Sequence, residues 1–323
     1  MKLNLYPPQK KIDGGNHTTA ARWVHILNSL GHHASIREFD VINCLPDEVE
    51  IFFNAAKSAN RIAEFKRVCS NSTRHKVVIV LSGTDLKAGM LELDETQAAM
   101  NVADALVAYE PSAMEKLTET QRDKAVLVPH SALSVPVPEF SFQDNGLNVI
   151  SVSHIRSEKN LAAYFRCLDN FQENQGLKFH HVGGTIDKNT AAEVMELAES
   201  NSNIQLHGMQ TFEQSIAMIK AADLLVHPSL VEGFPNVIVE AIVNGTPVAL
   251  SRIPAHTQTF SQSLPKTLFF DTDCLSELRQ LLQNFVTDST FRREIQHACD
   301  GVAEQFNPEF ERNGLLTLLQ KIE

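Results

Sequence analysis

Residues 222–241 read ADLLVHPSLVEGFPNVIVEA, and this stretch decides the fold that the rest of the sequence predicts. The apolar residues 224–226 predict a short strand, which the proline-containing run 227–229 ends. Residues 232–236 predict a tight turn because they combine glycine and proline. Residues 237–243 are apolar enough for a buried helix, so the stretch predicts a strand–turn–helix unit.

The turn and the helix start have two features that favour ligand binding. Pro235 lies near the first helical turn, where a missing N–H costs nothing, and the free backbone N–H groups there suit a phosphate. Glu232 lies in the turn and Glu240 lies inside the otherwise apolar helix. Burying an unpaired carboxylate is expensive, so Glu240 is expected to meet either ligand hydroxyls or a lysine or arginine.

Glu232 and Glu240 are separated by seven residues, GFPNVIV, and this spacing resembles the E-x7-E signature of family 4 glycosyltransferases. The resemblance implies the GT-B fold, an α/β architecture of two Rossmann-like doubly wound domains facing a cleft. It also implies that Glu232 holds hydroxyls of the donor sugar and that Glu240 holds the ribose hydroxyls of the nucleotide. The turn residues that it assigns to the donor are Gly233, Phe234, Pro235, Asn236 and Val237.

Composition limits the classes to which the chain can belong. Its 323 residues suit two domains, and 43% hydrophobic with 21% charged residues is ordinary for a globular protein. A net charge of −11 argues against a basic nucleic-acid surface. No run approaches the ~20 apolar residues of a spanning helix, so no stable membrane insertion is expected. The five scattered cysteines form no C-x-x-C pair, which favours reduced thiols and a cytoplasmic protein.

The amino-terminal half alternates apolar strands with helical segments, which predicts a doubly wound α/β domain. Residues 77–81 predict a central strand that is buried on both faces, as in a parallel sheet covered twice. A helix is expected over residues 20–27, capped by Thr18 or Thr19 and closed by Gly31. The other strands are expected at residues 3–6, 34–39, 50–53, 104–108 and 125–129, and another helix at residues 62–68.

Two loops of this half supply the acceptor-side candidates. The pair Gly14 and Gly15 is not a G-x-G-x-x-G fingerprint, and its simplest interpretation is a turn. Glycine also lets a substrate approach the backbone, and the family resemblance places this loop near donor phosphate and acceptor. Asp85 follows the central strand and is a candidate catalytic residue, although such residues more often cap a helix or stabilise a turn. The expected acceptor and phosphate loop comprises Gly14, Gly15, Asn16, Thr18 and Thr84.

Residues 135–146 predict a connector between the two halves because they contain two prolines and no helical period. We therefore expect an N-terminal Rossmann-like acceptor-side domain over residues 1–140 and a C-terminal Rossmann-like donor domain over residues 141–305. The resemblance implies that a last helix, in residues 306–323, crosses back to the N-terminal domain. The second half predicts strands at residues 147–152, 204–208, 224–226, 246–250 and 268–270, and a strand followed by a turn at residues 179–184. A helix is expected near residues 191–198.

Arg156 and Lys159 follow a predicted strand and precede a helix. A nucleotide-sugar has a diphosphate, so a site without metal needs cations or helix N-termini, and these two residues suit that role better than plain surface charge. Typical relatives have Gly-Arg where this chain has Ser153 and His154. Either Arg156 reaches the phosphate from a shifted position, or His154 takes part. Gly183, in the turn after the next strand, completes the predicted donor-binding residues.

Four runs together resemble the selenosugar-synthase branch of this family: residues 15–23, 82–86, 154–159 and 251–254. Those relatives join selenophosphate to a sugar taken from a UDP-sugar. The branch often has EGGANV in its turn, whereas residues 232–237 read EGFPNV, the ordinary glycosyltransferase form. A sugar or lipid hydroxyl therefore stays open as the acceptor.

The resemblance implies a hexosyltransferase that uses UDP-GlcNAc or UDP-glucose, with a small anionic acceptor such as selenophosphate and no metal or other cofactor. Its expected catalytic residues are Glu232, Arg156, Lys159 and Asp85. A non-catalytic nucleotide-sugar-binding protein and a GT-B sugar-nucleotide epimerase are the alternatives, because function depends on the site and not on the fold.

Overall fold

The computed structural model describes residues 1–8, 15–38, 48–69, 75–82, 85, 89–109, 111–132, 137–143, 146–168, 171, 176–232, 234–273 and 275–323. Contacts divide the chain into two compact units. The first unit comprises Met1–Ser131 together with Pro308–Glu323, and the second comprises Ala132–Asn307. Each unit contains one six-stranded sheet, and every strand pairing described is parallel.

The sheet of the first unit has the strand order β2-β1-β3-β4-β5-β6. Its strands are β1 (Lys2–Tyr6), β2 (His33–Ile36), β3 (Glu48–Phe53), β4 (Lys76–Val80), β5 (Ala105–Ala108) and β6 (Ala125–Leu127). Its helices are α1 (Gly15–Ser29), α2 (Ala55–Val68), α3 (Asp94–Val102), α4 (Pro111–Glu115), α5 (Glu119–Asp123) and α13 (Pro308–Ile322). The predicted strands of this half are present, with ends shifted by a few residues.

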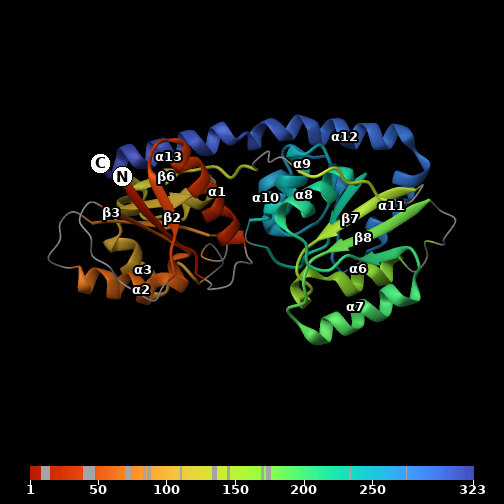
Figure 1. The fold of residues 1–323 in the computed structure, drawn as a ribbon, viewed down its shortest axis with the longest axis horizontal. Helices are drawn as coiled ribbons and strands as arrows, with labels where there is room; N and C mark the ends of the chain where they lie inside the picture. Colours follow the sequence, from red (N-terminus) through yellow and green to blue (C-terminus); the bar gives the residue numbers. More distant parts are fainter. Residues whose placement is uncertain are drawn as a thin grey trace. The chain divides into compact units, whose positions relative to one another are not determined.

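Helices cover both faces of this sheet, as Figure 1 shows for α1 and α13 on one side and α2 and α3 on the other. Successive side chains of β4 point to opposite faces. Val78 and Val80 therefore pack in the core with α1 and α13, whereas Val77 and Ile79 pack in the core with α2 and α3. All four are completely buried, which confirms the prediction of a central strand covered twice.

Helix α1 begins at Gly15, before the predicted start at residue 20. Thr18 and Thr19 therefore lie inside the helix, and the expectation that one of them caps it is wrong. The hydroxyl of Thr19 instead donates to the carbonyl oxygen of Gly15 at 3.0 Å. The predicted end of the helix is confirmed, because Gly31 follows its last turn with a φ of +84°, which glycine adopts without strain.

Helix α13 is anchored in the first unit by a carboxylate without solvent exposure, Glu311. Arg22 of α1 donates to it with two nitrogens, at 2.6 and 3.0 Å, and the indole nitrogen of Trp23 donates at 2.8 Å. The Ser131 hydroxyl donates to the second carboxylate oxygen. Both oxygens of Glu311 are thus satisfied, and the buried guanidinium balances the charge.

The sheet of the second unit has the strand order β12-β11-β10-β7-β8-β9. Its strands are β7 (Leu147–Val152), β8 (Leu177–Val182), β9 (Ile204–Leu206), β10 (Leu224–His227), β11 (Val248–Ser251) and β12 (Phe269–Phe270). Its α-helices are α6 (Leu161–Cys167), α7 (Lys188–Ser200), α8 (Phe212–Ala221), α9 (Asn236–Val243), α10 (Pro254–Phe260), α11 (Ser276–Thr287) and α12 (Ser289–Ala303). Short 3₁₀ turns are η1 (Ser157–Lys159), η4 (Lys266–Leu268) and η5 (Glu304–Phe306).

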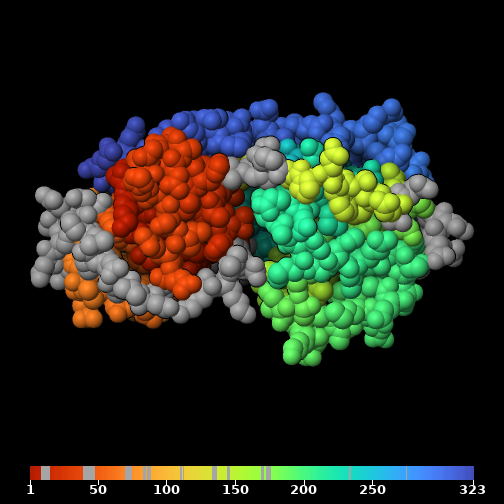
Figure 2. Space-filling model, in the orientation of Figure 1, coloured from red at the N-terminus to blue at the C-terminus, as the bar shows by residue number. Residues whose placement is uncertain are grey.

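Residues 137–143 of the predicted connector have no regular secondary structure and lie on the outside of the second unit, in yellow in Figure 2. Val137 and Phe142 pack against the core of that unit. The Phe142 ring stacks on His180 of β8, with ring centroids 3.9 Å apart. The connector is therefore attached to the second unit by an aromatic contact.

Two expectations from composition can be compared with the structure. Cys167 and Cys299 have free thiols, but Cys69 is disulfide-bonded, so the expectation of reduced cysteines is wrong at that position. Among the described residues, no helix combines the length and the apolar character that a membrane crossing requires.

We expect Glu311→Gln to lower the free energy of unfolding by about 3–5 kcal/mol, because it leaves the Arg22 guanidinium buried without its counter-charge. Urea denaturation followed by tryptophan fluorescence measures this change, since Trp23 also contacts Glu311. Lys321→Gln, at an exposed position of the same helix, is the control and should change stability by less than about 0.5 kcal/mol. Equal stability of the two variants would contradict the anchoring role of Glu311.

Candidate functional site

The strand order of the second sheet places a ligand site between β7 and β10. From β7 the chain continues to β8 and β9 on one side and then returns to β10 on the other side. In open parallel sheets, ligands bind beyond the carboxyl ends of the strands where the order reverses in this way. The loops that follow β7 and β10 contain Lys159 and Glu232, so the topology brings two predicted site residues to this point.

Lys159 and Glu232 form an ion pair that leaves each side chain only about a tenth exposed (11% and 10%). The Lys159 ammonium group donates to Oε1 of Glu232. The same oxygen accepts a hydrogen bond from Nε2 of His227, the last residue of β10, at 2.8 Å. A backbone hydrogen bond from Leu230 N–H to the Glu158 carbonyl oxygen, 2.8 Å long, joins the two loops.

The charges of this cluster follow from its burial and its contacts. Burial alone would raise the pKa of Glu232, but the hydrogen bond from His227 and the charge of Lys159 outweigh it and hold that pKa well below its usual range. Burial lowers the pKa of His227 in spite of its contact with Glu232. At neutral pH the cluster therefore consists of a carboxylate, an ammonium group and a neutral imidazole.

A second histidine lies behind the first. The rings of His227 and His256 have centroids 5.3 Å apart. Nδ1 of His256 donates to the Ser251 carbonyl oxygen at 2.8 Å, and burial, helped by the neighbouring His227, lowers the pKa of His256 to about 3. The Ser251 hydroxyl donates to the Ser229 carbonyl oxygen at 2.6 Å. The back of the cluster is thus built from neutral, buried groups at the ends of β10 and β11.

Helix α9 begins beside this cluster, with Pro235 as its N-cap. Ile238 and Val239 are buried, whereas Glu240 is half-buried, so the expectation of a carboxylate enclosed by apolar residues needs correction. The reason is helical geometry, because Glu240 shares its face of α9 with the half-buried Val237 and Val243 and not with the buried Ile238 and Ile242. The turn residues Phe234, Pro235, Asn236 and Val237 all lie at this helix start, and Gly233 lies outside the described residues.

The loop after β7 contains two polar atoms that have no hydrogen-bond partner among the described residues. Nε of Arg156 and Nδ1 of His154 are buried atoms that make no hydrogen bond with any part of the chain that the structure describes. Arg156 immediately precedes η1, whose last residue is Lys159. Nδ1 of His154 lies 3.6 Å from the position that a Cβ atom would take on Gly184. The unsatisfied atoms leave both residues as candidates for the shifted phosphate contact.

The backbone conformation and the close packing at position 183 require glycine. Its φ is +151°, and a Cβ atom at this position would lie 1.8 Å from the carbonyl oxygen of Ser153. The N–H of Gly183 donates to the Gly208 carbonyl oxygen, and the N–H of Ile155 donates to Gly184. The missing side chain lets the loops after β7 and β8 approach each other, which places His154 and Arg156.

The acceptor-side candidates belong to the first unit. Asp85 is fully buried and accepts hydrogen bonds from the N–H groups of Ala55 and Ala56, both at 3.1 Å, and from Ser82 N–H at 2.8 Å. Asp85 thus holds the start of α2 with both oxygens and its own turn through Ser82, which are the two structural roles that the sequence left open for it. Burial nevertheless raises the pKa of Asp85 despite these contacts.

The remaining acceptor-side residues divide into two groups. Gly15, Asn16 and Thr18 form the first turn of α1, at the carboxyl end of β1, where the N–H groups of a helix start are found. Gly14 and Thr84 lie outside the described residues.

His227 and His256 were not among the predicted site residues. The sequence shows His227 only as the first residue of the run that ends a predicted strand, and one buried histidine in a sequence is more often part of a core than of a site. His256 lies far from Glu232 in sequence, so only the pairing of β10 with β11 brings it to the cluster. Among the described residues, no group of three His, Cys, Asp or Glu side chains is arranged to hold a metal.

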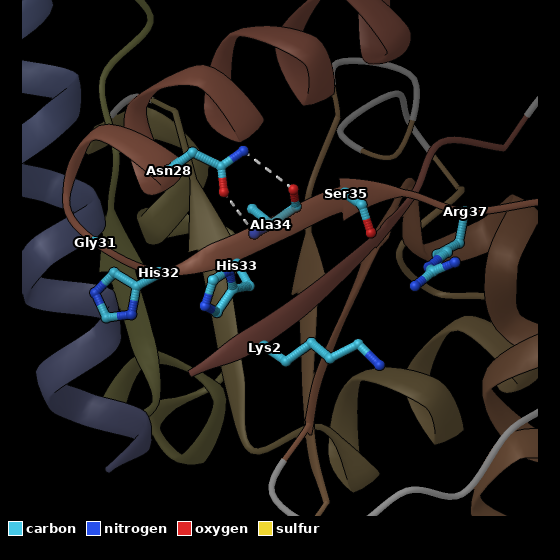
Figure 3. A pocket seen from close by; sticks show the side chains of 8 residues that line it. All are labelled: Lys2, Asn28, Gly31, His32, His33, Ala34, Ser35 and Arg37. Atoms are coloured by element: carbon cyan, nitrogen blue, oxygen red, sulfur yellow. Dashed lines mark hydrogen bonds between the residues drawn. The ribbon is translucent and has the colours of Figure 1, made fainter.

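A groove of about 640 Å³ lies elsewhere, at the edge strand β2 of the first unit (Figure 3). Its polar side chains serve the fold: Asn28 bonds both the N–H and the carbonyl oxygen of Ala34, and Lys2 pairs with Glu48 at 2.5 Å. The groove lies at the sheet edge and contains none of the predicted site residues, which separates it from the candidate site.

Comparison with solved structures supports the fold. The chain resembles sucrose-phosphate synthase from Thermosynechococcus elongatus, with a TM-score of 0.73 and 15% identity over 100% of this chain and 99% of that one. It also resembles Anabaena HepE, solved with UDP and glucose, with a TM-score of 0.72 and 13% identity over 99% and 100%. A trehalose-6-phosphate structure from E. coli, bound with UDP-2-fluoro glucose, has a TM-score of 0.69 and 10% identity over 99% of each chain. No curated protein matches by sequence.

Two parallel sheets flanked by helices, matched over the whole chain by these structures, define the GT-B class and confirm the predicted fold. The family model of the group 1 glycosyl transferases matches residues 138–299, which is half of the chain. The protein belongs to this family. It is a glycosyltransferase that moves a sugar from a nucleotide-sugar donor.

We expect Gly183→Ala to lower the free energy of unfolding by more than about 2 kcal/mol, because the new methyl group collides with the backbone of Ser153. Thermal unfolding followed by circular dichroism measures this loss. Gly301→Ala is the matched control, since a Cβ atom on that residue of α12 meets no atom within 4 Å. The control should be neutral or more stable by about 0.5–1 kcal/mol, and equal loss in both variants would disprove the close approach at Gly183.

Proposed function

We propose that the protein transfers a hexosyl group from a UDP-sugar, such as UDP-glucose or UDP-GlcNAc, to a small anionic acceptor. The observation that supports this proposal most is the meeting of Lys159 with Glu232 at the switch point of the second sheet, beside the start of α9. A cation and a helix N-terminus suit a diphosphate, and an adjacent carboxylate suits sugar hydroxyls.

Each residue around this point receives a role in the proposal. Arg156, Lys159 and the amides at the start of α9 bind the diphosphate and meet the negative charge that develops on the leaving oxygen. Glu232 orients the sugar through its hydroxyls, and Glu240 accepts from the ribose hydroxyls. No metal enters this scheme, because fixed cations and backbone N–H groups supply the positive charge.

The nucleotide is inferred to be UDP because of the solved relatives. HepE has been solved with UDP and glucose, and the E. coli structure with UDP-2-fluoro glucose. At 13% and 10% identity these structures share only the fold with this chain, so they suggest UDP, while the site residues of this chain support a diphosphate.

For the acceptor we favour selenophosphate, because the runs around Gly15, Asp85, Arg156 and Arg252 resemble the selenosugar-synthase branch. The first turn of α1, with Gly15, provides backbone N–H groups of the kind that bind small anions. A sugar or lipid hydroxyl is the second candidate, which the EGFPNV form of the turn after Val231 favours.

We expect Arg156→Ala and Lys159→Ala each to weaken UDP binding about tenfold or more and to leave uridine binding nearly unchanged, because the charge-assisted bonds to the diphosphate are lost. Isothermal titration calorimetry with UDP and uridine measures both affinities. Lys220→Ala, at an exposed position of α8, is the control and should match the wild type. If only His154→Ala weakens UDP selectively, the assignment of the phosphate to Arg156 is wrong.

Incubating the protein with selenophosphate and either UDP-glucose or UDP-GlcNAc should break the C1–O bond to UDP and form a C1–Se bond. The products are UDP and a selenosugar that mass spectrometry detects, either with the phosphoryl group still on selenium or after its release as phosphate by water. Lys159→Ala protein serves as the control and should give little product. Transfer to a hydroxyl acceptor, with no selenosugar under the same conditions, would disprove selenophosphate as the acceptor and leave the donor assignment intact.

A further inference from the structure

The two carboxylate oxygens of Glu232 differ in their hydrogen bonds. Lys159 and His227 both donate to Oε1. Oε2 accepts no hydrogen bond from any residue in the described ranges, although the side chain is about 90% buried, with 10% exposed. Oε2 is not among the fully buried polar atoms of the described residues, so it keeps some exposure and can accept a hydrogen bond from a ligand. One oxygen therefore holds the side chain in place while the other is left for a hydroxyl.

Lys159 alone is not expected to keep the Glu232 carboxylate in place once a donor has bound. The proposed function gives the same ammonium group a second task, binding the donor diphosphate. A lysine is a flexible point charge that reorients readily toward a new anion. When a diphosphate enters, Glu232 needs another donor that has no competing task.

His227 meets this requirement. It is 2% exposed, and its pKa is lowered by burial, so the ring is neutral. A neutral ring that donates from Nε2 has no proton on Nδ1, which fixes the tautomer. The contact with Glu232 therefore depends on neither a positive charge on the ring nor the position of Lys159.

The surroundings of His227 hold its ring still. The Ser229 hydroxyl lies 3.1 Å from the same Nε2 atom, and the His256 ring packs against its side. His256 is itself held by the bond from its Nδ1 to the carbonyl oxygen of Ser251. A ring enclosed in this way loses little further entropy when a ligand binds, which is the condition for a preorganised site.

We infer that His227 is a positioning residue, which keeps Oε2 of Glu232 directed at the donor sugar after Lys159 has turned to the diphosphate. This inference rests on the proposed function, because it assumes that Glu232 binds the sugar. It predicts that His227 contributes to binding only when the nucleotide has a sugar attached.

The experiment compares the affinities for UDP-glucose and UDP in His227→Phe, which keeps a ring but has no donor, and in His227→Gln, whose amide restores a neutral donor. His227→Phe should weaken UDP-glucose about tenfold and UDP by less than about twofold, since one charge-assisted hydrogen bond is lost. His227→Gln should recover most of this loss. His75→Phe, which replaces a buried histidine of the first unit whose ring nitrogens bond none of the described residues, is the matched control and should bind both ligands as the wild type does.

Two outcomes would overturn the inference: unchanged affinity for UDP-glucose in His227→Phe, or an equal loss for UDP and UDP-glucose, which is what a purely structural residue would show. A wild type that binds neither ligand would instead disprove the proposed function.

A titration without any ligand tests the contact between His227 and Glu232 on which the inference depends. Carbon-13 NMR of glutamate-labelled protein should show a higher pKa for Glu232 in His227→Phe than in the wild type, because a hydrogen bond to the charged form is missing. An unchanged pKa would show that His227 does not hold this carboxylate.

Discussion

The buried ion pair between Lys159 and Glu232 is the interaction on which the site depends. Two charges removed from water are stable only when they meet each other with good geometry and with further hydrogen bonds. The pair therefore constrains the loops after β7 and β10 to one arrangement. His227 supplies the additional bond, and the start of α9 lies next to the pair because the turn after Glu232 is short.

The first unit contains a comparable buried carboxylate, and the contrast between the two is informative. Glu311 has both oxygens bonded, by Arg22, Trp23 and Ser131, so it has no capacity left for a ligand and serves to hold α13. Glu232 is almost as buried but has one oxygen that no described residue bonds. This difference in hydrogen bonding supports the proposal that Glu232 binds a ligand whereas Glu311 serves the fold.

Much of the fold could be predicted because its signals are local. The run at residues 77–81 is apolar at every position, which only a strand covered on both faces requires, and β4 has that environment. The E-x7-E spacing located Glu232 and the start of α9. Helix ends were predicted less well, since Thr18 and Thr19 are ordinary capping residues and yet the helix begins at Gly15. The sequence left a catalytic and a structural role open for Asp85. Its contacts with the start of α2 join segments that are distant in sequence, so no local pattern predicts them.

The sequence by itself determined the alternation of strands and helices, the family signature and the residue types that suit a nucleotide-sugar. These properties depend on neighbours along the chain, or on a spacing of one or two helical turns. Only the tertiary structure decided that Lys159 meets Glu232, that His227 and His256 stand behind them, and that Gly183 is needed for loop packing. The physical reason is that parallel strands are connected by long crossovers, so residues that share one sheet edge are far apart in sequence, and their contacts leave no local pattern.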